Sequence, residues 1–183
     1  MKYRKIIFIL LFVIQLFVPL SMIIQKEIIL DKGVIVKFQV EPVDPYDAFR
    51  GKYLNIGVVE NKYDIENNDF SENQDIYVLL EIDDDGFAQL DQISIHPFRN
   101  DLYIKCAIDF IGEEYIHIEF PFDRFYLNEK YSQAGEDLFQ KYSRGTREDA
   151  YITVKINNGK AVLENMYIQG IEINQFIEIE MDR

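Results

Sequence analysis

Two short stretches of the sequence combine arginine with carboxylates at a spacing that could bind a substrate. The first is "VEPVDPYDAFRGKYLNI" (residues 40–56), and the second is "FDRFYLNE" (residues 122–129). A guanidinium group binds anions through paired hydrogen bonds, and carboxylates can exchange protons with a substrate. The candidate binding residues are the charged side chains of these stretches and one tyrosine: Asp44, Asp47, Arg50, Tyr53, Asp123, Arg124 and Glu129. None of them is assigned a catalytic role.

The arginines allow two interpretations. In the first, Arg124 forms a buried ion pair with Asp123 or Glu129 that holds a loop in place. In the second, Arg50 and Arg124 face each other and clamp an anion or a substrate. The two interpretations differ in whether these side chains reach solvent.

The first stretch also has the pattern of a corner in the fold. Asp44 can accept hydrogen bonds from the free N–H groups of a helix start, and Pro45 fits the first turn. Gly51 fits the left-handed position that follows the end of a helix. We therefore expect one or two helical turns at residues 45–50, between two strands.

The other reactive residue types indicate no further site. His96 and His117 lack the spacing of metal ligands. Residues 83–86, "DDDG", carry consecutive acids where a calcium loop alternates them, which favours a hairpin turn. Cys106 is the single cysteine, which excludes an intrachain disulfide, and we expect it as a small buried strand residue. The sequence therefore predicts neither a metal nor a cofactor.

The charge of the chain argues against one class of partner. Its 183 residues include 32 acids and 19 bases, a formal net charge of −13. All of the acids lie after residue 26, and a field of that sign repels phosphate backbones. Nucleic acid is therefore not expected as a partner.

The N-terminal segment predicts a membrane anchor. Residues 6–24, "IIFILLFVIQLFVPLSMII", form 19 uncharged residues, which as a helix can cross about 30 Å of hydrocarbon. Three bases precede them and favour a cytoplasmic N-terminus, with residues 27–183 outside the cell membrane. No small-residue cleavage pattern follows, so we expect an uncleaved single-pass anchor at residues 1–26. Gln15, near mid-span, is either a tolerated amide or a donor to a neighbouring membrane helix.

The rest of the chain reads as strands. Apolar residues recur with period two from Val34 to Val40, and further β-rich runs follow up to residue 168. Residues 157–160, "NNGK", predict a hairpin, and residues 171–181 predict a last alternating strand. Residues 61–74 predict a polar surface loop, and residues 132–142 predict a helix with Ser132 as its cap. The expected fold is mainly β: an antiparallel sandwich or barrel-like domain with one or two short helices, after an N-terminal transmembrane helix.

The sequence also resembles the GDYXXLXY family of bacterial membrane-anchored proteins. The resemblance rests on the first stretch, on "FDRFYLNE", and on the late hairpin "NNGKAVLENMYIQG" (residues 157–170). The chain departs from the family signature at Lys52, Ile56 and Val58, and Lys52 removes an acid. The resemblance implies no established activity, and it implies a gene that lies beside one for a multi-pass membrane protein.

Two functions from different classes follow. The first is a non-enzymatic extracytoplasmic domain that acts as the partner or accessory of an integral membrane protein. It rests on the uncleaved anchor, on Gln15, on the acidic domain and on the lack of a recognisable catalytic group. The alternative is an extracytoplasmic hydrolase that uses the carboxylates and arginines near Arg50 and Arg124, or a small-ligand sensor. The sequence leaves enzymatic activity uncertain and favours its absence.

Overall fold

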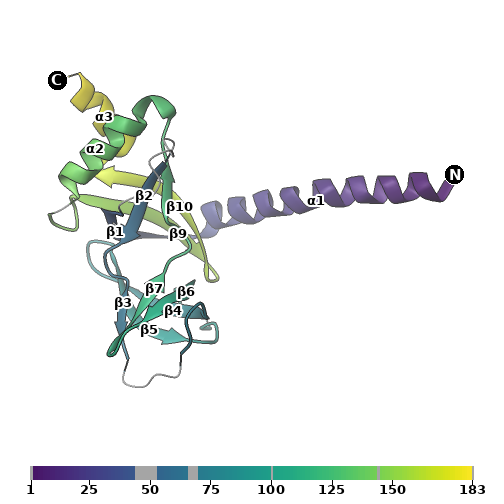
Figure 1. Ribbon diagram of the computed structural model, residues 1–183, viewed down its shortest axis with the longest axis horizontal. Coiled ribbons are helices and arrows are strands. Elements are labelled where there is room, and N and C mark those ends of the chain that lie inside the picture. The colour runs from purple at the N-terminus through teal and green to yellow at the C-terminus, as the bar shows by residue number, and fades with distance from the viewer. Residues whose placement is uncertain (1, 44–52, 66–69, 100, 144, 183) are drawn as a thin grey trace.

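The computed structural model describes residues 2–43, 53–65, 70–99, 101–143 and 145–182. Two antiparallel sheets form the body of the protein, and a long N-terminal helix projects from it (Figure 1). The predicted mainly β class with few short helices is therefore confirmed. The elements, in chain order, are α1 (Lys2–Lys32), β1 (Val34–Pro42), β2 (Tyr53–Val58), β3 (Lys62–Asp64), β4 (Asp75–Ile82), β5 (Ala88–Ser94), β6 (Tyr103–Ile111), β7 (Tyr115–Glu119), β8 (Arg124–Tyr126), η1 (Glu129–Tyr131), α2 (Ser132–Tyr142), β9 (Ala150–Asn157), β10 (Lys160–Ile168), β11 (Ile171–Glu172) and α3 (Ile173–Met181).

The two sheets differ in strand order. One has six strands in the order β11-β10-β9-β1-β2-β8, and the other has five in the order β3-β7-β6-β4-β5. Two isolated parallel bridges, Lys37 with Phe87 and Ile104 with Gly159, connect them. The hairpin of β9 and β10 therefore contacts both sheets.

The core is built from the alternating apolar residues of both sheets. In β1, Val36 and Val40 are fully buried, as period-two alternation predicts. Phe38 lies between them, with its ring centroid 5.5 Å from that of Phe120 and 5.3 Å from that of Phe122. Cys106 is a buried residue of β6, as expected, and burial raises the pKa of its thiol.

The last predicted strand is wrong. Only Ile171–Glu172 is a strand, and residues 173–181 form α3, which packs against α2 (Figure 1). The buried residues Ile173, Phe176 and Ile177 are spaced i, i+3 and i+4, which is the spacing of one helix face. The Phe176 ring meets that of Tyr142 edge-on at 5.2 Å. Packing against α2 therefore selects the helix.

Two smaller predictions need correction. The segment of residues 61–74 is not all loop, because Lys62–Asp64 forms β3 and pairs with β7. Ser132 begins α2 as predicted, but its side chain does not cap the helix. Its Oγ instead donates to the carbonyl of Asn128, whose own side chain caps the preceding turn η1.

The hairpin of β9 and β10 is confirmed. Asn158 and Gly159 both have positive φ, 49° and 76°, which is the conformation that an Asn-Gly turn supplies. The turn at residues 83–86 is also confirmed, because Asp83 Oδ1 accepts from the backbone N–H groups of Asp85 and Phe87 at 3.0 and 2.8 Å. The helical turns expected at residues 45–50 lie outside the described residues.

Helix α1 is long and apolar enough to cross a membrane, judged by length and composition. The large apolar side chains described between Ile6 and Ile28 are exposed, while Ile29 is buried against the domain. The helix runs to Lys32, six residues past the predicted end of the anchor, and Gly33 N donates to Ile29 O at 2.8 Å. No linker therefore separates α1 from β1.

Candidate functional site

Arg124 lies on the exposed edge strand β8 of the six-stranded sheet. It pairs in register with Asn55 of β2, and Tyr126 pairs with Tyr53. The Arg124 guanidinium carbon lies 5.1 Å from the centroid of the Tyr53 ring, a cation–π contact. Strand pairing therefore brings together Tyr53 and Arg124, which are 71 residues apart in the sequence.

The acid–base neighbours of the second stretch are paired at the surface. Arg124 Nε lies 3.2 Å from Asp123 Oδ2, and the two side chains are 42% and 70% exposed. The prediction of a buried ion pair is therefore wrong for Asp123 and Arg124. An exposed pair contributes little to stability, about 0–1 kcal/mol, so this ion pair does little to hold the fold together.

Both residues line a groove of about 720 Å³, here called the Arg124 groove. Its walls come from the end of α1, the segment that contains β8, strand β10 and the start of α3. The lining residues are Lys26, residues 121–126, residues 161–165, Glu172 and Asn174. Residues from four separate segments thus converge at the side of the domain from which α1 leaves.

The other predicted site residues are placed as follows. Tyr53 contacts Arg124 beside the groove. Glu129 lies in η1 and is not a lining residue, although it has an interaction partner elsewhere. Asp44, Asp47 and Arg50 lie outside the described residues, so whether Arg50 faces Arg124 stays a prediction.

The groove has the chemistry of a binding site for a polar ligand. Its cations are Lys26 and Arg124, and its carboxylates are Asp123, Glu164 and Glu172. The carboxylates could exchange protons with a ligand, but the described lining holds no serine, threonine, cysteine or histidine. No group of three metal-ligating side chains occurs among the described residues of the chain. The lining therefore offers charge pairing and hydrogen bonds.

A family model described as "GDYXXLXY protein" matches residues 15–166. The chain belongs to the GDYXXLXY family. The match begins inside α1 and ends in β10, so it includes all groove-lining residues except Glu172 and Asn174. Neither a curated protein nor a solved structure matches this GDYXXLXY protein.

Sequence reasoning missed part of the groove and one arginine. The sequence predicts only an anchor residue at Lys26 and one arm of a hairpin at residues 160–168. Arg147 is not among the predicted site residues, yet its guanidinium binds Glu60 Oε1 and Asp83 Oδ2, each at 2.9 Å. No local pattern marks Arg147, because its two partners are 87 and 64 residues away in the sequence.

Proposed function

We propose that this GDYXXLXY protein is a single-pass membrane protein whose extracytoplasmic β domain acts as a non-enzymatic partner of another integral membrane protein. In this proposal α1 crosses the cell membrane with its N-terminus in the cytoplasm. The amide of Gln15, exposed near the middle of the uncharged run of residues 6–24, is the single observation that carries the proposal.

Gln15 needs a partner inside the membrane. It has no hydrogen bond with any residue that the structure describes, and its side chain is exposed. A polar amide in hydrocarbon without a hydrogen bond costs about 2–7 kcal/mol. A neighbouring transmembrane helix can supply that bond, as polar residues do between membrane helices.

The junction between α1 and the domain supports the same proposal. Lys160 Nζ donates to Gln25 Oε1 at 2.6 Å, and Lys155 Nζ donates to the carbonyl of Leu30. The last turns of α1 are thus held by both strands of the β9–β10 hairpin. A domain fixed in this way keeps one orientation to the membrane, which suits docking against a partner that is itself in the membrane.

Photo-crosslinking from two positions of α1 in native membranes tests the proposal. A photoreactive residue replaces Gln15 in one variant and Phe17 in the other, which lies about 200° away around the helix. We expect position 15 to give an adduct with one integral membrane protein and position 17 to give mainly lipid adducts. The same partner should co-purify with the unmodified chain and be lost with Gln15→Leu. Equal labelling from both positions, or no protein adduct from either, would contradict the proposal.

The orientation is tested separately by protease protection. Protease added to sealed right-side-out vesicles should degrade the β domain, and protease added to inverted vesicles should leave it intact. The reverse pattern would contradict the extracytoplasmic placement.

The Arg124 groove supports a second function, the sensing of a small polar ligand. Its volume of about 720 Å³ lies within the range of about 300–1,000 Å³ that is usual for ligand sites. Thermal unfolding of the full chain against a panel of small anions and zwitterions tests this function. A stabilising ligand whose effect disappears in Arg124→Ala and persists in Lys130→Ala would support it, and no stabilising ligand in the panel would count against it.

A further inference from the structure

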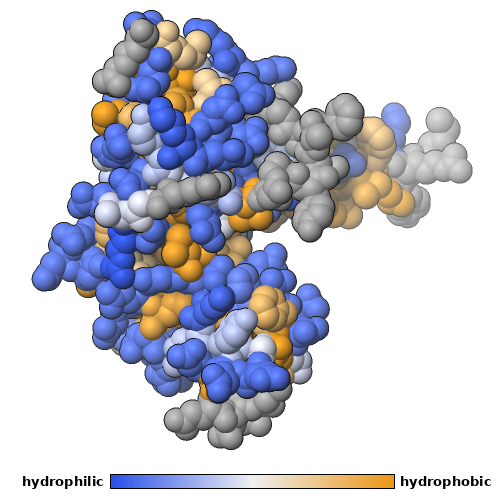
Figure 2. All heavy atoms as spheres, turned by 60° about the vertical axis from the view of Figure 1, so that its left-hand side comes forward, coloured by the Kyte–Doolittle hydropathy of each residue, from blue (hydrophilic) through white to orange (hydrophobic). Residues whose placement is uncertain are grey.

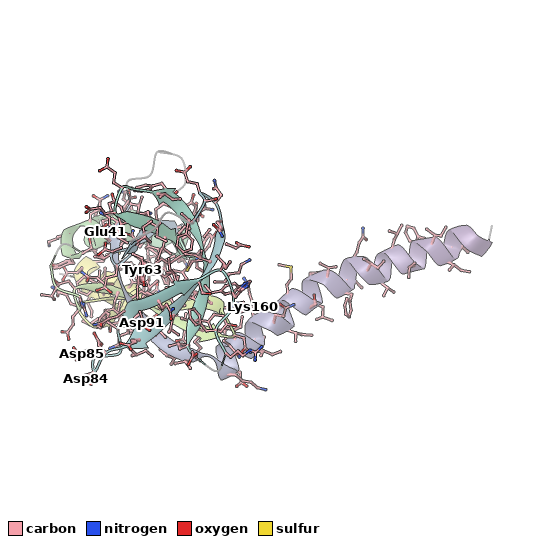
Figure 3. All side chains as sticks on the ribbon, turned by 90° about the horizontal axis from the view of Figure 1, so that it is seen from below. Glu41, Tyr63, Asp84, Asp85, Asp91 and Lys160 are labelled. Atoms are coloured by element: carbon pink, nitrogen blue, oxygen red, sulfur yellow. The ribbon has the colours of Figure 1, made fainter. Side chains whose placement is uncertain are left out.

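A second, smaller hollow lies where α1 meets the β domain. It has a volume of about 350 Å³ and is here called the junction hollow. Its lining consists of Met22, Gln25, Lys26 and Ile29 from α1, Lys105 and Pro121 from the domain, and residues 159–162 from the β9–β10 hairpin. Figure 3 shows Lys160 of this hairpin beside the base of α1.

We propose that the junction hollow binds the phosphate and glycerol of an anionic phospholipid from the membrane that surrounds α1. The proposal rests on the proposed function, because it requires α1 to lie in a membrane. It adds a ligand class and a site that the partner role does not need.

Charge is the first argument. The hollow is lined by three lysines, Lys26, Lys105 and Lys160, and none of its described lining residues is acidic. This concentration of positive charge occurs in a chain that has 32 acids and 19 bases. Residues elsewhere on the domain show the opposite character, such as Asp84 and Asp85, which in Figure 3 lie on the side away from α1.

The three ammonium groups differ in how they are held. Lys105 Nζ lies 2.6 Å from Asp75 Oδ2, and this hydrogen bond raises the pKa of Lys105, so its ammonium group stays charged. Lys160 donates to the neutral amide of Gln25, which leaves its charge uncompensated. Lys26 makes no hydrogen bond or ion pair with any part of the chain that the structure describes. Two of the three charges can therefore serve an external anion.

Position is the second argument. Met22 belongs to the uncharged run that ends at Ile24, and Lys26 follows two residues later, about 3 Å further along the helix. The polar layer of a bilayer leaflet is roughly 5–7 Å thick. If Ile24 ends the hydrocarbon span, Lys26 lies at the depth of lipid phosphates, and Met22 lies at the depth of the acyl chains.

The apolar part of the hollow completes the match. Met22, Ile29, Pro121, Ala161 and Val162 line the hollow together with the lysines and give it an apolar part. A phospholipid likewise combines a charged phosphate with an apolar glycerol ester and acyl chains. The hollow also shares Lys26, Pro121, Ala161 and Val162 with the Arg124 groove, so a headgroup has room to extend there.

Native mass spectrometry of the full chain, released from neutral detergent micelles, tests the proposal. The micelles carry phosphatidylglycerol or phosphatidylcholine, and a third sample carries soluble glycerol phosphate. We expect one bound phosphatidylglycerol, at least roughly tenfold tighter than phosphatidylcholine, and no competition by glycerol phosphate. Since each lysine near an anionic lipid contributes about a fivefold gain in affinity, Lys26→Gln combined with Lys160→Gln should weaken binding roughly thirtyfold.

A second pair of substitutions, Lys62→Gln with Lys130→Gln, makes the same charge change outside the hollow and should keep the lipid. Carbonate extraction of membranes is done first for all variants. If the chain stays in the membrane but binds both lipids equally, binds glycerol phosphate as well as lipid, or responds equally to both double substitutions, the lipid site is overturned while the partner role stands. If the chain is released by carbonate, both proposals fail.

Discussion

Replacement of Gly159 by alanine tests whether the β9–β10 hairpin locks the two sheets together. Gly159 has φ +76°, and its carbonyl accepts from Lys105 N of the other sheet at 2.9 Å. A Cβ at this position would lie 2.5 Å from Cε2 of Tyr103. The Tyr103 ring cannot move away freely, because it packs against the rings of Tyr77 and Phe98.

Gly170 supplies a matched control for the energetic cost of placing alanine in a left-handed backbone conformation. Its φ is +77°, almost that of Gly159, and a Cβ built there meets nothing within 4 Å. Gly170→Ala should therefore lower the free energy of unfolding by about 1 kcal/mol, through the left-handed backbone alone. Gly159→Ala should lower it by that amount and by a further 1–3 kcal/mol for overpacking, which gives about 2–4 kcal/mol in total.

Urea unfolding of the full chain in detergent micelles, followed by near-ultraviolet circular dichroism of its tyrosines, measures both values. The contact itself is isolated by repeating Gly159→Ala in a Tyr103→Ala background, where the obstructing ring is absent. There the substitution should again lower the free energy of unfolding by only about 1 kcal/mol. Equal losses for Gly159→Ala and Gly170→Ala in the natural background would refute the contact between the hairpin and β6.

Three other substitutions or reagents probe separate parts of the fold. Arg147→Ala should lower the free energy of unfolding by about 1–2 kcal/mol, because two half-exposed ion pairs are lost. Salt at about 0.5 M screens such pairs and should therefore reduce the difference between the variant and the natural chain. A loss that does not depend on salt would contradict this. Burial raises the pKa of the Cys106 thiol, so a thiol reagent at about pH 8 should label Cys106 only in the urea-unfolded chain. Rapid labelling of the native chain would contradict its burial. Ile177→Ala should lower the free energy of unfolding by about 2–4 kcal/mol, and Ile179→Ala should lower it by less than about 0.5 kcal/mol, because only Ile177 is buried. Equal losses in urea unfolding would contradict the helix and indicate a strand at residues 171–181, which would place both side chains on one face.

The β domain and the N-terminal helix differ in the hydropathy of their surfaces. Figure 2 shows a mostly hydrophilic β domain with scattered apolar patches, and an apolar surface along the receding helix. In the proposed membrane placement, the acidic domain surface faces solvent, while the lysines at the junction face the layer where phosphates lie. In that placement the same chain presents opposite charges to the solvent and to the membrane surface.

Much of the fold could be predicted from the sequence because its signals are local. Alternation along β1 fixes which side chains enter the core, and Asn158-Gly159 fixes the hairpin at one position. The uncharged run of residues 6–24 is long enough to identify α1 without any tertiary information. Each of these elements is specified within about ten to twenty residues, the scale on which periodicity can be read.

The candidate site could be predicted only in part, because its walls are far apart in the sequence. Asp123 and Arg124 were identified by residue type, but Lys26 and Glu164 enter the same groove through the docking of α1 and the course of β10. A shift of register between Leu163 and Asn165 changes which β10 side chains face outward. No pattern in a single sequence shows where such a shift falls.

The C-terminal segment shows how two periods can compete in one sequence. Residues 171–181, "IEINQFIEIEM", alternate except at Gln175-Phe176, where the apolar and polar positions are exchanged. A strand would place Phe176 among the acids on the solvent face, whereas a helix places it beside Ile173 and Ile177 on one buried face. That single exchange was the available signal for α3. Tertiary packing decides between the strand and the helix, because the Tyr142 ring of α2 packs against the Phe176 ring and only the helical face can then be buried.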